Sequence, residues 1–226
     1  MTETMKHFKL RTDLTIKVGL KTLYRIEATK DIEKFGVKAG DLGGYIEKED
    51  NLSGDAWVSG DAKVYGNAKV SEDALVSGDA EVYENAKVYG NAQVYGDAWV
   101  SGNAEVYENA KVYGNAQVYG DAWVSGDALV CGNARVSCDA EVYGNADVYG
   151  DTIEKENDLI NITSNTGSYN ITITPNHIKI GCQYHSKTEW FKFTENKIRK
   201  MDGKRAVDWW KTWKPILKSI CDGLKQ

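Results

Sequence analysis

Cysteine and histidine stand close together near the end of the chain, at Cys182 and His185, with Trp190 five residues further on. A thiolate and an imidazole are good zinc ligands, but a zinc site in a protein needs three or four ligands. His177 and Cys221 are the residues that would complete such a site. The pair by itself is more typical of ordinary structural residues, and we expect no metal and no other cofactor.

Tryptophan and lysine are concentrated in the same region. Four of the seven tryptophans lie within residues 151–226, and lysines follow them at short spacing. Tryptophan is over-represented among the residues that dominate protein–protein binding, and exposed lysines would surround Trp209. The sequence therefore suggests a partner-binding face, formed by Cys182, His185, Trp190, Trp209, Lys211 and Lys214.

A structural interpretation competes with this one. Trp190, Trp210 and Trp213 also suit the core of a small domain, where large aromatic rings supply most of the buried area. A nucleic-acid site built from the lysines and tryptophans is a further alternative. Residues 54–150, however, contain 15 Asp/Glu and 5 Lys/Arg, which would repel nucleic acid. We expect a protein partner.

Catalysis would need a general base, and histidine serves most often. The chain has three histidines, His7, His177 and His185, and none lies between residues 52 and 151. The glycine-rich run from Gly36 to Gly44 lacks a following helix, which a phosphate-binding loop requires. The sequence predicts no catalytic residue and no enzyme.

The middle of the chain must position these residues, and its sequence is strictly periodic. From Val58 to Val148 a valine recurs at every sixth residue, sixteen in all, and an alanine stands two residues before each. The alternation Ala-x-Val is strand spacing, and the Gly-Asp or Gly-Asn pair before it is typical of a corner. Each six-residue unit therefore predicts a short strand followed by a bend.

Three such units close one triangular coil of a solenoid, with valine and alanine inside. A single coil cannot fold alone, because burying a valine contributes about 1.5–3 kcal/mol whereas fixing one residue's backbone costs about 1–2 kcal/mol. Stacked coils share backbone hydrogen bonds. Residues 52–150 supply about five and a half coils, some 25 Å long at the usual strand spacing of about 4.8 Å.

The hexads, the run from Leu23 to Ile26 and the run from Gly40 to Ser53 resemble the YdcK-like hexapeptide-repeat proteins of enteric bacteria, phages and prophages. These are often labelled polymer-forming proteins or putative transferases. The resemblance covers residues 20–150 and implies a left-handed parallel β-helix. The resemblance also suggests acyl-transfer activity. Related acyltransferases, however, use a histidine of a coil or loop as general base, and these hexads contain no histidine. The spacing Gly181, Cys182, His185, Trp190 resembles a small domain of unknown function attached to phage proteins.

Periodicity also assigns the outward residues to three sides. Each side receives one tryptophan, Trp57, Trp99 or Trp123, among mixed charges, so no side is a uniform array. Tyrosines after the valines are expected to stack between neighbouring coils. Residues 78–102 recur as 102–126 with one change, Asp79 to Asn103, and this shift of four hexads rotates the copy by one side. A function tied to one side would not survive such a duplication, so the solenoid is interpreted as a spacer.

The flanking segments read as end domains. Residues 1–51 predict a β cap, with strands at Thr15 to Val18 and Leu23 to Ala28. Residues 152–226 predict a small α+β domain, with strands at Leu159 to Thr163, Tyr169 to Thr174 and His177 to Gly181. A short helix is expected after Ser186, then a turn at residues 201–203, and a final tryptophan-rich helix that Pro215 should kink.

The fold class is thus mainly β, with a solenoid at residues 52–151 between a cap and a small α+β domain. No apolar run is long enough to span a membrane, and the cysteine spacing shows no disulfide framework, so we expect a cytoplasmic protein. The resemblance to the YdcK-like proteins implies that this cytoplasm is that of a bacterial host. The favoured function is a non-enzymatic binding protein of phage or prophage type that contacts a host protein, as a dimer or trimer. The alternatives are a self-assembling polymer and an acyltransferase.

Overall fold

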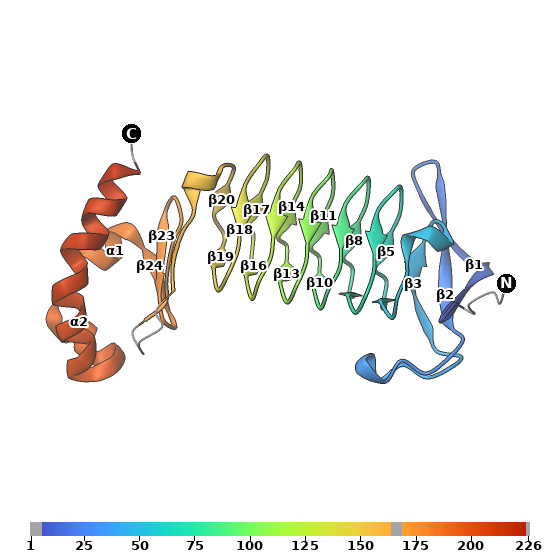
Figure 1. The fold of residues 1–226 in the computed structure, drawn as a ribbon, viewed down its shortest axis with the longest axis horizontal. Helices are drawn as coiled ribbons and strands as arrows, with labels where there is room; N and C mark the ends of the chain where they lie inside the picture. Colours follow the sequence, from blue (N-terminus) through green and yellow to red (C-terminus); the bar gives the residue numbers. More distant parts are fainter. Residues whose placement is uncertain (1–5, 164–168, 225–226) are drawn as a thin grey trace. The chain divides into compact units, whose positions relative to one another are not determined.

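The computed structural model describes residues 6–163 and 169–224, and the chain divides into two compact units between residues 156 and 157. The first unit is a parallel β-solenoid with an N-terminal β cap (Figure 1). The second is a small antiparallel sheet with two helices. The predicted fold class is confirmed.

Three parallel sheets form the sides of the solenoid. The first side contains β4 (Trp57–Val58), β7 (Leu75–Val76), β10 (Gln93–Gly96), β13 (Lys111–Gly114), β16 (Leu129–Cys131) and β19 (Asp147–Tyr149). The second contains β5 (Lys63–Val64), β8 (Glu81–Val82), β11 (Trp99–Val100), β14 (Gln117–Val118), β17 (Arg135–Val136) and β20 (Thr152–Ile153). The third contains β6 (Lys69–Val70), β9 (Lys87–Val88), β12 (Glu105–Val106), β15 (Trp123–Val124) and β18 (Glu141–Val142).

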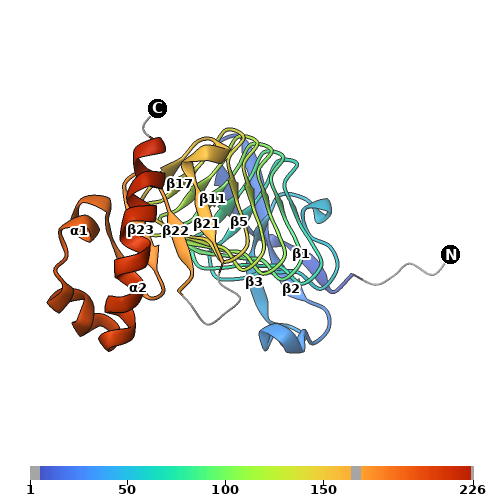
Figure 2. The same cartoon turned by 60° about the vertical axis from the view of Figure 1, so that its left-hand side comes forward.

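Every valine and alanine of the hexads points inward, and each has 0 % of its surface exposed. Valines pair with valines in the next coil, as Val58 does with Val76. Backbone bonds join the coils: the Trp57 amide donates to the carbonyl of Ala74 at 3.0 Å. Figure 2 shows the coils stacked one behind another. The predicted register of three hexads per coil is confirmed.

The corners require a positive φ, which glycine adopts without steric cost. Gly90 and Gly126 have φ of 71° and 70°, but Glu108 takes the same conformation at 59°. The carboxylate of Glu108 accepts a hydrogen bond from the backbone N–H of Gly126 at 2.7 Å. Glu72 and Glu84 repeat this arrangement with Gly90 and Gly102. A side-chain bond to the next coil therefore offsets backbone strain wherever glutamate replaces the corner glycine.

Polar and aromatic ladders run along the outside of the solenoid. Asn67 donates to Asn85 at 3.2 Å, Asn85 to Asn103 at 3.1 Å, and Asn103 to Asp121 at 2.8 Å. The predicted tyrosine stacking is confirmed. The stacked pairs, with ring centroids 4.9–5.2 Å apart, are Tyr65–Tyr83, Tyr89–Tyr107 and Tyr95–Tyr113.

The N-terminal cap contains β1 (Phe8–Val18), β2 (Lys21–Ala28) and β3 (Leu42–Ile46), with 3-10 turns at Glu33–Phe35 and Glu49–Asn51. β1, β2 and β3 are antiparallel, and β3 pairs in parallel with β5. The cap thus continues the second side of the solenoid. The glycine-rich run expected to be a loop up to Gly44 is a strand from Leu42 onward.

Gly43 and Gly44 lie in β3, which stacks in parallel on the first coil. A Cβ at Gly43 would come within 2.5 Å of both Ile26 and the carbonyl oxygen of Val58. A Cβ at Gly44 would meet the carbonyl oxygen of Ala62 at 2.6 Å. Close backbone packing therefore explains why glycine occupies both positions. A phosphate-binding role is not needed to explain them.

Trp57 occupies an outward-facing position of the first coil, but the cap covers it. Its side chain is 2 % exposed and packs near Gly43 and His7. His7 forms a hydrogen bond through Nε2 with the carbonyl oxygen of Ala56 at 2.8 Å. Burial lowers the pKa of His7. The period alone placed Trp57 on the surface; the cap, which is not periodic, buries it.

The last coil ends beyond the predicted boundary at residue 151. Thr152 pairs with Arg135 and Ile153 with Val136, one residue short of the regular step. Ile153 is fully buried and takes the place of the next valine. Because the step between these coils is one residue shorter than 18, the final core residue does not fall at the position that the hexad pattern predicts. The parallel pairing likewise starts before residue 52, at Tyr45 and Ile46 in β3.

The C-terminal unit has the sheet order β21-β22-β23-β24. These strands are β21 (Ile160–Ile162), β22 (Ile171–Ile173), β23 (His177–Ile180) and β24 (Gln183–Ser186), and a 3-10 turn at Glu156–Asp158 precedes them. Three of the strands lie within the predicted ones. The fourth, β24, was not predicted, because its sequence Gln-Tyr-His-Ser shows no apolar alternation.

Two helices follow, α1 (Lys187–Lys192) and α2 (Glu195–Gly223). Figure 2 shows both on the same side of the sheet β21–β23. Ser186 caps α1 by accepting from the amide of Glu189, as predicted. Asp202 and Gly203 have non-helical backbone angles within α2, at the predicted turn. The helix continues through Pro215, where a kink was predicted.

Candidate binding site

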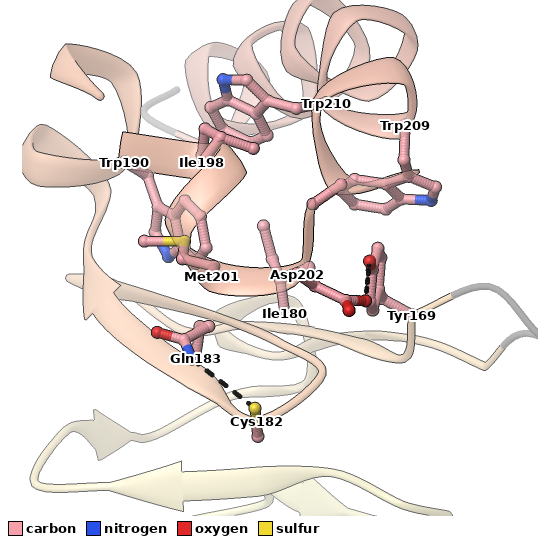
Figure 3. Close-up of a pocket in the computed structure, with 11 residues that line it drawn as sticks. Tyr169, Ile180, Cys182, Gln183, Trp190, Ile198, Met201, Asp202, Trp209 and Trp210 are labelled. Carbon is pink, nitrogen blue, oxygen red and sulfur yellow. Dashed lines mark hydrogen bonds between the residues drawn. The ribbon is translucent and has the colours of Figure 1, made fainter. Parts of the chain in front are cut away.

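A pocket of about 320 Å³ opens in the C-terminal unit between the sheet and α2 (Figure 3). Eight of its eleven lining residues are aromatic or aliphatic, and three are polar. The lining residues are Tyr169, Ile180, Cys182, Gln183, Trp190, Ile198, Met201, Asp202, Ala206, Trp209 and Trp210. A concave, mostly apolar cavity with a few polar groups is typical of a ligand site.

The break in α2 creates this space. Gly203 has φ 65° and ψ −154°, a conformation that strongly favours glycine, and it redirects the chain between Met201 and Ala206. The two parts of α2 therefore approach the sheet at different places and form two walls of the pocket. Ile180 lies on the sheet side in Figure 3.

Tryptophans form much of the wall. Trp190 is 2 % exposed and donates from Nε1 to the carbonyl oxygen of Ile178 at 2.7 Å. Its ring lies 5.3 Å from that of Trp210. Trp209 stacks on Trp213 at 5.4 Å and meets the edge of Tyr169 at 5.1 Å. These contacts fix the rings in place.

Tyr169 and Asp202 form a polar pair on one side of the pocket. The Tyr169 hydroxyl donates to Oδ2 of Asp202 at 2.5 Å. The guanidinium of Arg205 lies over the Tyr169 ring, 5.5 Å from its centroid. Burial, together with the bond to Asp202, raises the pKa of Tyr169 to about 12. The hydroxyl is therefore a neutral donor that is already engaged.

The six residues predicted for a partner face are only partly brought together. Cys182, Trp190 and Trp209 line the pocket. Trp190 is buried, so it cannot belong to an exposed face and serves the core instead. Trp209 is partly buried, and Cys182 is exposed.

His185 lies outside the pocket lining, half-buried on β24. Its ring meets the edges of Trp190 at 5.2 Å and Phe193 at 4.9 Å. Its Nε2 is buried without a hydrogen-bond partner, and burial lowers the pKa of the imidazole. A neutral ring is therefore expected near pH 7.

The two lysines lie on α2, also outside the pocket lining. Lys211 is exposed and forms an ion pair with Glu195 at 3.1 Å. Lys214 places its ammonium 5.6 Å from the centroid of the Trp210 ring. They contribute to a basic surface: residues 157–226 contain 12 Lys/Arg and 6 Asp/Glu.

Several pocket residues were missed from the sequence. Met201 and Asp202 were expected only as part of a turn, and Ile198 and Ala206 carried no signal apart from helical spacing. Tyr169 was assigned to a strand. These residues come together because α2 breaks at Gly203, and no local sequence pattern predicts which residues such a break brings together.

Metal binding finds no support in the geometry. Within residues 6–163 and 169–224, no group of three or more His, Cys, Asp or Glu is placed to hold a metal ion. His177 instead stacks on Tyr184 at 4.8 Å, and Cys221 is buried in the core at 3 % exposure.

The solenoid offers a different kind of surface. Two open depressions lie beside Trp99 and Trp123, whose side chains are 46 % and 47 % exposed. These tryptophans occupy equivalent places in the duplicated block but lie on different sides, in β11 and β15. The duplication therefore does not gather them into one site, in agreement with the predicted rotation.

Comparison with known proteins identifies the repeats. The family model for the YdcK β-solenoid repeat matches residues 86–102, 92–108, 110–126 and 116–132. No curated protein matches the chain. Of the helices in the described part of the chain, none combines the length and apolar character needed to cross a membrane. The repeats in this part of the chain are therefore similar to the YdcK β-solenoid repeat, and the structure shows that they form a β-solenoid.

Proposed function

We propose that this YdcK-like solenoid protein is a non-enzymatic binding protein of phage or prophage type. The solenoid is a spacer, and the C-terminal unit contacts a host protein in the bacterial cytoplasm, inhibiting or sequestering it. A component of host defence is the target class we favour. The active form is a dimer or trimer.

The contrast between the two units carries this proposal. The solenoid repeats one environment, and its two exposed tryptophans lie on different sides. The C-terminal unit combines a basic surface with partly buried aromatic rings, including Trp209 and Trp213. Unique aromatic and basic groups of this kind are frequent in protein interfaces, and the surface charge favours an acidic partner.

Point substitutions in the full chain test where the contact lies. The chain is used as bait in lysate from infected cells, and the captured protein is then titrated in purified form. Replacing Lys211 and Lys214 together by glutamate should weaken capture by at least about tenfold, because two attractive charges become repulsive. Replacing Trp99 and Trp123 by alanine should leave it unchanged. Loss of capture in the tryptophan variant alone would contradict the proposal.

The spacer role has its own test. Coils repeat at 18 residues, so deleting residues 84–101 joins Tyr83 to Gly102 and removes one complete coil in register. Capture by this shortened protein should persist, since no coil contributes a unique contact. Deleting residues 157–226 should abolish capture.

Self-assembly is the main alternative, and β1 is the feature that favours it. This strand of 11 residues forms the edge of the nine-stranded sheet, and a long edge is a template for pairing with another chain. Lys9, Asp13 and Lys17 place charges along it, which usually discourages such pairing. Light scattering over a range of concentrations should give a fixed small oligomer; steady growth with concentration would indicate a polymer.

Acyl transfer is the enzymatic alternative. His7 is engaged with the carbonyl of Ala56 beneath the cap, and no histidine occurs in residues 52–151. Calorimetric titration with acetyl-CoA should show no saturable binding. Tight binding with turnover would overturn the non-enzymatic assignment.

A further inference from the structure

We infer that the pocket of the C-terminal unit is a binding site for a neutral aromatic small molecule of one or two rings. This goes beyond the proposed protein contact, because it concerns the interior of the unit rather than its exposed lysines. The inference depends on the size of the pocket, the charge balance of its lining, and one amide at its rim.

Size and lining select the body of the ligand. A volume of about 320 Å³ lies at the lower end of the range for small-molecule sites, about 300–1,000 Å³. Trp190, Trp209, Trp210 and Met201 contribute aromatic and thioether surface, which favours an aromatic ring through edge-to-face and sulfur contacts. Apolar cavities of smaller size are known to bind benzene, because little bound water must be displaced.

The charges at the pocket favour a neutral ligand over a strongly charged one. Among the lining residues that the structure describes, Asp202 is the one with an acidic or basic side chain. Its carboxylate already accepts the Tyr169 hydroxyl, and Arg205 lies over the same tyrosine ring. An anion would face the carboxylate of Asp202, whereas a cation would approach the guanidinium of Arg205, which lies over the Tyr169 ring next to this end of the pocket. A neutral molecule meets neither penalty.

Gln183 supplies a polar contact at the rim. Its amide nitrogen donates to the thiol of Cys182 at 3.6 Å. Sulfur is a weak acceptor, so a ligand oxygen can replace it with a gain in hydrogen-bond strength. The amide oxygen can accept from a ligand N–H or O–H. The favoured ligand therefore carries one hydroxyl or ring N–H, as phenol and indole do.

Titration of the full chain with indole and with phenol tests the site. Calorimetry should give saturable binding of one molecule per chain, and near-ultraviolet circular dichroism should change because tryptophans line the pocket. Indole-3-acetate and tryptamine, which carry opposite charges, should each bind at least about tenfold more weakly than indole. Absence of saturable binding, or tighter binding of either charged analogue, would overturn the inference.

Two variants place the binding. Ala206→Phe adds a ring inside the pocket and should abolish indole binding, whereas Trp99→Ala removes an exposed solenoid tryptophan and should not change it. Because Ala206 is 7 % exposed and the larger residue can disturb folding, Gln183→Leu provides a milder check. This variant should retain toluene binding but lose the preference for phenol over toluene. Wild-type affinity for indole in Ala206→Phe, or an unchanged phenol preference in Gln183→Leu, would place the ligand elsewhere.

Discussion

The solenoid and the C-terminal unit bury apolar residues in different ways. Inside the solenoid nearly every buried residue is valine or alanine, and its partner is the same residue type in the adjacent coil. In the C-terminal unit the buried cluster combines isoleucines with Trp190, Trp210 and Leu217 from strands and helices. Identical small side chains stack in register from coil to coil, whereas unlike large ones meet at irregular angles and leave a pocket. A repeat is thus suited to fixing distance, and an irregular core to building a unique site.

The largest expected difference between the units comes from a core truncation. Leu217 is fully buried, so Leu217→Ala should destabilise the C-terminal unit by about 2–5 kcal/mol. Its neighbour Ile216 is 44 % exposed, and Ile216→Ala should cost less than about 0.5 kcal/mol. Tryptophan fluorescence and far-ultraviolet circular dichroism during urea unfolding follow both units. An equal loss in the solenoid transition would show that the units do not unfold separately.

A smaller effect is expected where the solenoid departs from its repeat. Asn51 is fully buried; its Nδ2 donates to the carbonyl of Ala68 at 2.8 Å, and its Oδ1 accepts from the amide of Lys48 at 2.9 Å. Asn51→Ala leaves these groups unpaired and should cost about 1–3 kcal/mol.

The exposed ladder residue Asn85 is the matched control for that change. Asn85→Ala removes similar side-chain bonds in contact with water and should cost less than about 1 kcal/mol in the same urea experiment. An equal loss of unfolding free energy in the two variants would mean that burial of Asn51 at the first coil is not the reason for its contribution to stability.

Corner chemistry gives a finer test within the solenoid. Glu108→Ala keeps the positive φ but removes the bond to Gly126, and should destabilise by about 1 kcal/mol. Glu108→Gly loses the same bond but relieves the backbone, so its stability should stay close to that of the wild type. Chemical denaturation of the two variants side by side checks the order; a Gly variant weaker than the Ala variant would contradict the offset between strain and hydrogen bond.

The smallest expected effects depend on pH and concern one histidine in each unit. Burial lowers the pKa of both His7 and His185, so the unfolded chain binds protons more readily than the folded one. Stability should therefore be full above about pH 6.5, the usual histidine pKa, and decline as the pH falls below it. His7→Gln should flatten this decline for the solenoid unit, and His185→Phe for the C-terminal unit. Thermal unfolding midpoints measured between pH 8 and pH 5 follow this decline. A rise in stability on acidification would contradict the lowered histidine pKa values.

The sequence by itself determined the solenoid: its three sides, the inward valines from Val58 to Val148, and the stacking of tyrosines. That was possible because each core contact joins residues at one constant separation, so the local pattern and the long-range contact carry the same information. Trp57 shows the limit. Its position in the six-residue repeat predicts that it is exposed, and only the folded cap buries it.

Tertiary structure alone decided the pocket and the final coil. Ile153 closes the solenoid after a shortened step, and Asp202 approaches Tyr169 because α2 breaks at Gly203. β24 forms from a sequence without strand alternation, since pairing with β23 satisfies its backbone. In these places the contacts join segments of unlike sequence at unrelated separations. Their positions follow from how whole elements pack, which periodicity and residue type do not specify.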